Sequence, residues 1–176
     1  MATTYKLIEA VTVGAGGQAA IEFTNIPATY TDLILKLSLR SSTGAAHLGG
    51  AQMIFNNSTA TNYSFRNMRG DGDGSSPGSG TATGSAYIRV TNNHPTVGNN
   101  SNTFCNSTVY IPNYSSSLAK TTHEDNVEEN NTTEAYIQIV NGAWSLTSAI
   151  TSIKLTSEET AFVQYSTAYL YGISNA

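Results

Sequence analysis

The strict alternation of apolar and polar residues over Thr31–Arg40 is the feature that most restricts the fold of this chain. Leu33, Leu35, Leu37 and Leu39 occupy every second position. Successive side chains of a β-strand point to opposite faces, so this spacing places all four leucines on one face. A helix would distribute them around its circumference. The segment is therefore predicted to be a strand with its leucine face in a hydrophobic core.

Further segments rich in β-branched and aromatic residues, each bounded by turn residues, are predicted to be strands as well. They are Tyr5–Val13, Ala19–Thr24, Gln52–Asn56, Tyr63–Met68, Ser85–Thr91, Thr103–Pro112, Leu118–Val127, Ala135–Val140, Ala149–Thr156 and Phe162–Ile173. The first two are joined by a glycine-rich turn, which is typical of a β-hairpin. No segment has the pattern of an amphipathic helix. The chain is predicted to be all-β, either a sandwich or a barrel.

The organisation of the chain indicates one domain. Its 176 residues fall within the usual size of a single domain, roughly 100–200 residues, and neither a repeat nor a change in composition divides it. We therefore predict one domain over residues 1–176. The stretch at about residues 70–84 is rich in Gly and Ser and lacks large apolar residues, which predicts an exposed, mobile loop.

Composition argues against several classes of function. Charged residues make up 11% of the chain and the net charge is −4, whereas nucleic-acid binding requires clustered Lys and Arg. The single cysteine, Cys105, can form neither an internal disulfide nor a thiolate metal cluster. The chain opens with no signal-peptide pattern and has no apolar run of about 18 residues. We expect a protein made in a cytoplasm that binds neither nucleic acid nor membrane.

Three patterns resemble catalytic or metal-binding motifs but are better explained as turns. Gly74–Gly78 matches the nucleophile-elbow pattern, but a proline follows the central serine and no strand-turn-helix context surrounds it. Asp71–Gly74 resembles the opening of a calcium loop that no glutamate closes. His47, His94 and His123 lack the spacing of metal ligands and are expected to be solvated. We therefore expect no catalytic residue, no metal site and no cofactor.

The main acidic cluster contains Glu124, Asp125, Glu128, Glu129 and Glu134. The simplest interpretation is a solvated face or loop. Glu124, Asp125, Glu128 and Glu129 are nevertheless candidate contact residues for a basic surface on a partner protein. A glycosidase pair of carboxylates is a further alternative, although few of the aromatic residues typical of sugar sites lie nearby in the sequence.

Both ends of the chain carry a distinctive series of strand and turn residues. The first series contains Tyr5–Ile8, Gly14–Gly17, Ile21–Pro27, Tyr30–Leu33 and Leu39–Ser42; the second contains Trp144, Ala149–Leu155 and Phe162–Ile173. Together they resemble the jelly-roll modules of tailed bacteriophages, especially phages of cyanobacterial and other aquatic hosts. Such modules occur in head decoration (cement) proteins, head fibres and tail fibres. The resemblance covers both terminal thirds of the chain and leaves roughly residues 43–135 without a counterpart.

This resemblance implies a single jelly-roll-like antiparallel β-sandwich of about 8–10 strands. It also implies a place on a virion, and it carries over no binding residues. The expected role is a non-enzymatic capsid decoration protein on the capsid exterior, made in the host bacterial cytoplasm. It would form a homo-oligomer, a trimer, and bind the major capsid protein or other virion proteins. The alternative is a tail-fibre or head-fibre module that binds host glycans, and a third class is a glycan-cleaving depolymerase.

Overall fold

A computed structural model describes residues 4–43, 49–72, 77–99, 101–129 and 135–174. These residues form strands and no helix, so none of them belongs to a helix long and apolar enough to span a membrane. The strands are β1 (Tyr5–Thr12), β2 (Ala20–Phe23), β3 (Asp32–Leu39), β4 (Gly49–Phe55), β5 (Tyr63–Asp71), β6 (Gly78–Ser85), β7 (Ile88–His94), β8 (Cys105–Ile111), β9 (Lys120–Glu129), β10 (Ala135–Trp144), β11 (Ile153–Ser157) and β12 (Thr167–Ile173). The all-β prediction is confirmed, with 12 strands instead of 8–10.

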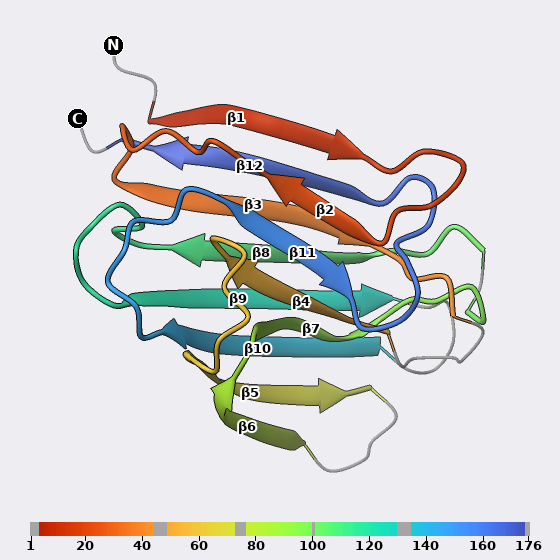
Figure 1. The fold of residues 1–176 in the computed structure, drawn as a ribbon. Helices are drawn as coiled ribbons and strands as arrows, with labels where there is room; N and C mark the ends of the chain where they lie inside the picture. The colour runs from red at the N-terminus through yellow and green to blue at the C-terminus, as the bar shows by residue number, and fades with distance from the viewer. Residues whose placement is uncertain (1–3, 44–48, 73–76, 100, 130–134, 175–176) are drawn as a thin grey trace.

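The strands form two antiparallel sheets that lie face to face (Figure 1). The larger sheet has eight strands in the order β1-β12-β3-β8-β9-β10-β5-β6, and the smaller has four in the order β2-β11-β4-β7. The predicted sandwich is thereby confirmed. In Figure 1 the smaller sheet lies in front of the larger one, and the β5–β6 hairpin extends below it.

Four ladders pair the two halves of the chain in nested order. β4 pairs with β7, β3 with β8, β2 with β11 and β1 with β12. These ladders belong alternately to the smaller and the larger sheet, so the eight strands behave as one long hairpin folded onto itself. β5 and β6 are inserted between β4 and β7, and β9 and β10 between β8 and β11. All four inserted strands join the larger sheet and extend it past the smaller one.

The nested order corrects one prediction. The segments Tyr5–Val13 and Ala19–Thr24 do not form a hairpin, because β1 lies in the larger sheet and β2 in the smaller. The turn between them is real: Gly17 N donates to Gly14 O at 3.0 Å, and Gly17 has a positive φ of 70°. This turn carries the chain from one sheet to the other instead of back along the same sheet.

The hydrophobic core fills the space between the sheets. The four leucines of β3 are buried and belong to one continuous apolar cluster with residues of both sheets, as their alternation predicted. At the other end of this cluster, the ring of Trp144 lies edge-on to Phe55, with centroids 5.6 Å apart, and stacks on Tyr63 at 6.1 Å. Aromatic pairs in these geometries add about 0.5–1.5 kcal/mol beyond the burial of their area. The core therefore anchors both sheets from β12 across to β5.

The stretch predicted to be a loop at residues 70–84 is mostly a β-hairpin. β5 enters it and β6 covers Gly78–Ser85, while residues 73–76 lie outside the described residues. Glycine is needed here because the partner strand carries long side chains across it: a Cβ on Gly80 would overlap the amide of Asn67. The absence of large residues thus reflects cross-strand packing within a strand, which composition alone does not distinguish from a loop.

Candidate functional site

Strand β9 places three residues of the acidic cluster, Glu124, Asp125 and Glu128, on two opposite faces of the larger sheet. Glu124 and Glu128 lie on the inner face with 1% and 2% of their surface exposed, whereas Asp125 is exposed on the outer face. The side chain of Glu129 and the whole of Glu134 lie outside the described part of the chain. The prediction that Glu124 and Glu128 contact a partner is therefore wrong, because both are enclosed within the sandwich.

The buried carboxyl group of Glu124 has apolar neighbours in both adjoining strands. Its ladder partners are Val109 in β8 and Val140 in β10, and neither carboxyl oxygen has a hydrogen-bond partner among the described residues. Burial raises the pKa of Glu124 well above its usual value of 4.5, and the nearby charge of Asp125 adds to this shift. Burial therefore favours the neutral, protonated form of this group.

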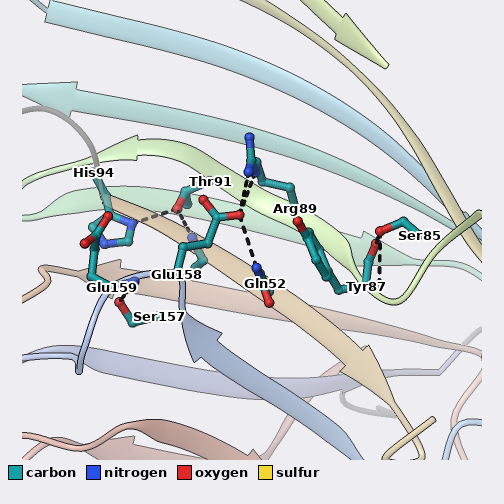
Figure 2. Close-up of polar contacts among 10 residues, drawn as sticks. Gln52, Ser85, Tyr87, Arg89, Thr91, His94, Ser157, Glu158 and Glu159 are labelled. Carbon is teal, nitrogen blue, oxygen red and sulfur yellow. Dashed lines mark hydrogen bonds and ion pairs between the residues drawn. The ribbon is translucent and has the colours of Figure 1, made fainter. Parts of the chain in front are cut away.

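A chain of buried polar groups links β7 to β4 and β11 of the same sheet and to the loop after β3. His94 Nδ1 lies 2.8 Å from Thr91 Oγ1, as Figure 2 shows, and His94 Nε2 contacts Ser41 Oγ. Ser41 Oγ lies 2.8 Å from Ser157 Oγ. Thr91 Oγ1 in turn accepts a hydrogen bond of 3.0 Å from Ala51 N. The network therefore satisfies both nitrogens of a histidine enclosed between the sheets.

A serine beside a histidine is the pairing that activates nucleophiles in hydrolases. Here Ser41 and His94 are both fully buried, so no substrate reaches the hydroxyl and we interpret the pair as structural. Burial lowers the pKa of His94 to about 3, which keeps the ring neutral. The prediction of a solvated His94 is wrong for this reason. His123 is exposed, and His47 lies outside the described residues.

No group of three or more His, Cys, Asp or Glu side chains in the described ranges is arranged to hold a metal ion. Most of the nucleophile-elbow pattern and half of the calcium-loop pattern fall at residues 73–76, which lie outside the described residues. Asp71 belongs to β5, so the strand continues into the segment predicted to be a turn.

The smaller sheet carries an ion pair at its β7 edge. Glu158 Oε1 accepts from Arg89 Nε at 2.8 Å and lies 2.7 Å from Arg89 Nη2. The same oxygen accepts from Gln52 Nε2 at 3.3 Å (Figure 2). Half-exposed pairs of this kind contribute at most about 1 kcal/mol to stability. Their main consequence here is geometric, because they fix the direction of the Arg89 side chain beside β7.

The outer face of the larger sheet carries an exposed apolar cluster across β9, β10 and β5. Met68 is 61% exposed, Val127 49%, Ile137 57% and Ile139 37%. Ile137 is paired with Val127, and Ile139 with Met68. Directly paired side chains on one face lie about 4.5–5.5 Å apart at Cβ, so these four form one continuous surface. We call Met68, Val127, Ile137 and Ile139 the apolar patch.

The surroundings of the apolar patch are mostly neutral and polar. Toward β8 and β3, the outer-face residues beside it are Thr108, Asn106 and Ser38. Lys36 Nζ donates to Thr108 Oγ1 at 2.8 Å, and Asp125 lies beside Ile139. An apolar centre with a polar rim is the usual composition of a protein-binding surface. Of the predicted contact residues, Asp125 is the one whose described side chain borders this surface.

The sequence did not single out the apolar patch. Ala135–Val140 has apolar residues at both parities, so its alternation does not tell which set is buried. Trp144 lies in the same strand and is buried, so every second residue counted back from it also faces inward. Including Trp144 in the predicted strand would have placed Ile137 and Ile139 on the outer face.

Comparison with known proteins adds no assignment to these surfaces. No family model matches the chain, and neither the curated proteins nor the solved structures contain a significant match. The function is therefore inferred from the residues and their arrangement.

Proposed function

We propose that this protein is a non-enzymatic structural protein of a phage virion, a capsid decoration protein that binds the assembled head lattice. The observation that carries the proposal is the apolar patch, which lies on the broad outer face of the larger sheet with a mostly neutral, polar rim. Burial of apolar surface against a partner contributes about 25 cal/mol per Å². A protein that binds only the assembled lattice stabilises that lattice by mass action.

The strand order supports the jelly-roll part of this proposal. A jelly roll has eight strands in two packed sheets. The nested ladders supply two groups of four, β1-β12-β3-β8 and β2-β11-β4-β7, and the inserted strands extend only one of them. The two terminal stretches that resemble phage modules also pair with each other, through β1–β12 and β2–β11. The resemblance thus concerns one coherent unit of the fold.

The positions of the polar groups weigh against an enzyme. A glycosidase needs two carboxyl groups that converge on one cleft, whereas Glu124 and Asp125 point to opposite faces of the sheet and Glu124 is enclosed. The pairing of Ser41 with His94 is enclosed as well.

The proposal is tested by binding to capsids assembled without this protein. The variant Ile137→Asn removes apolar area from the centre of the patch, and Leu118→Asn is the matched control, because Leu118 is 70% exposed outside the patch. We expect Ile137→Asn to weaken binding by about tenfold and Leu118→Asn to bind as the unchanged protein does. Capsids that regain their heat resistance equally with both variants would show that the patch is not the docking surface.

The location and oligomeric state are tested on the particle itself. We expect averaged images of the virion to place this chain on the capsid exterior as a trimer that contacts the major capsid protein. Density in a tail or head fibre would overturn the decoration role and favour the alternative, a host-binding module for glycans.

A further inference from the structure

A groove of about 460 Å³ lies between the β5–β6 hairpin and β7, the outermost strand of the smaller sheet. The groove exists because the hairpin extends past the smaller sheet (Figure 1), so that its inner face forms one wall and β7 forms the other. The residues whose side chains face it include Phe65, Asn67, Arg69, Tyr87 and Arg89. This volume falls in the range of small-molecule sites, about 300–1,000 Å³.

Glycines on β6 keep the hairpin wall of the groove open. The ladder pairs Arg69 with Gly78 and Asn67 with Gly80. A Cβ on Gly78 would come within 2.9 Å of Arg69 Nε, and one on Gly80 would overlap the amide oxygen of Asn67. The Asn67 amide and the Arg69 guanidinium therefore lie over the backbone of β6, where the glycines carry no side chain. The Gly-Ser-Gly sequence of β6 leaves room for them and for a ligand above them.

The opposite wall is fixed by short local contacts. The ring of Tyr87 stacks on Phe65 with centroids 6.4 Å apart and an interplanar angle of 27°, which makes one end of the groove aromatic. Ser85 Oγ donates to Tyr87 O at 2.8 Å and accepts from Tyr87 N at 3.3 Å (Figure 2). Next along β7, Arg89 is oriented by Glu158. The aromatic and the polar parts of this wall are both held in place.

The electrostatics of the groove select a neutral ligand. Arg89 is paired with Glu158 at 2.7 Å, and Arg69 Nε lies 3.5 Å from Asp71 Oδ1. Each guanidinium thus has a carboxylate partner, and an anion gains little net attraction. The groove therefore presents guanidinium donors whose charge is compensated, beside the amide of Asn67, which both donates and accepts. Hydroxyl groups, which both donate and accept, suit this arrangement.

We propose that this groove binds a short neutral saccharide. The Phe65–Tyr87 end offers an apolar surface on which the face of a sugar ring packs, and the tyrosine hydroxyl adds a polar contact at its edge. The Asn67 amide and the Arg69 guanidinium form hydrogen bonds with sugar hydroxyls from the hairpin wall, and Arg89 does so from the β7 wall.

The saccharide site is independent of lattice docking. On β5, Asn67 and Arg69 face the groove, whereas Met68 between them belongs to the apolar patch on the opposite face. A chain docked through the patch leaves the groove accessible. Loss of one activity is therefore distinguishable from loss of the other.

The test is titration of the purified protein with a panel of neutral trisaccharides and matched uronic-acid trisaccharides, followed by calorimetry and NMR. We expect at least one neutral trisaccharide to bind at micromolar to millimolar concentration. Asn67→Ala and Tyr87→Ala should each weaken binding about tenfold. Tyr87→Phe should lose less than Tyr87→Ala, because it keeps the stacking ring. Met68→Ala is the matched control on the same strand and should bind as the unchanged protein does.

Thermal unfolding of each variant separates loss of binding from loss of folding. Asn67→Ala is the safer variant, because Asn67 is half-buried and does not belong to the core. Three results overturn the proposal. They are no binding by any neutral trisaccharide at millimolar concentration, binding restricted to the uronic acids, and equal affinity of Asn67→Ala and the unchanged protein.

Discussion

The buried carboxyl group of Glu124, which has no hydrogen-bond partner among the described residues, leads to a quantitative prediction about how stability depends on pH. The folded protein holds a proton on this group above pH 4.5, where the unfolded chain has begun to release it. Because the folded-state pKa is raised, the free energy of unfolding falls as the pH rises from 4.5 toward that folded value. The slope of this loss is about 1.4 kcal/mol per pH unit. The variant Glu124→Gln has no proton to release and loses the slope.

His94 has the opposite effect and must be separated from it. Its folded pKa is lowered to about 3, so its contribution to the free energy of unfolding rises between pH 3 and the usual histidine value of 6.5 and is constant above it. Between pH 4.5 and 6.5 the two slopes oppose each other in the unchanged protein. Subtracting the free energy of unfolding of the unchanged protein from that of Glu124→Gln cancels the contribution of His94, which both proteins share. What remains is the contribution of Glu124. This difference should grow by about 1.4 kcal/mol per pH unit above 4.5.

The assay is urea unfolding at several pH values, followed by the fluorescence of the single tryptophan, the buried Trp144. The amide of the variant is also buried, which shifts its whole stability curve by about 1–3 kcal/mol without changing the slope. Glu9→Gln, on the exposed strand β1, is the control and should follow the unchanged protein. Parallel curves for Glu124→Gln and the unchanged protein from pH 4.5 to about pH 8 would refute the reasoning, because the carboxyl group would then be ionised in the fold.

Two further predictions concern packing and burial. Gly172→Ala should lower the free energy of unfolding by about 1–3 kcal/mol, because the added Cβ would come within 2.6 Å of the Tyr30 ring. Gly14→Ala is the control, since a Cβ at Gly14 has no atom within 4 Å. Equal urea midpoints for the two variants would contradict this prediction. Burial raises the pKa of Cys105 to about 12. A thiol reagent at about pH 8 should therefore react with Cys105 only after the protein is unfolded in urea. Rapid labelling of the folded protein would contradict the enclosed position of this cysteine.

The sequence predicted best where one parity of a strand is apolar and the other polar. In β3 the leucine face is buried as expected, because no other assignment of faces keeps four leucines from water. At the end of the chain the prediction Phe162–Ile173 was too long. The chain turns at Tyr165, which has a φ of 71°, and β12 begins only at Thr167. Alternation does not report such a turn, because Tyr is a common strand residue.

β9 and β10 illustrate why the surfaces could not be predicted. In β9 the inner face carries Glu124, Asn126 and Glu128, and Asn126 accepts a 2.6 Å hydrogen bond from Ser107 of β8. Polar residues on this face are enclosed by neighbouring strands that the sequence of β9 does not identify. In β10 a shift of the pairing register by one residue would exchange the inner and outer faces. Such a shift would expose the ring of Trp144, so the burial of this residue fixes the register. The predicted strand ended at Val140 and so omitted the residue that decides the question.

The nested ladders also determine when each part of the fold can form during translation. β7 and β8 emerge before β11 and β12, so the ladders β4–β7 and β3–β8 can close while the carboxyl-terminal strands are still unmade. β1 precedes and β12 follows the other strands of the sandwich, and the two pair with each other. β1 therefore has no ladder partner until the rest of the sandwich has been made. The tip of the long hairpin can fold first, and the pairing of β1 with β12 comes last.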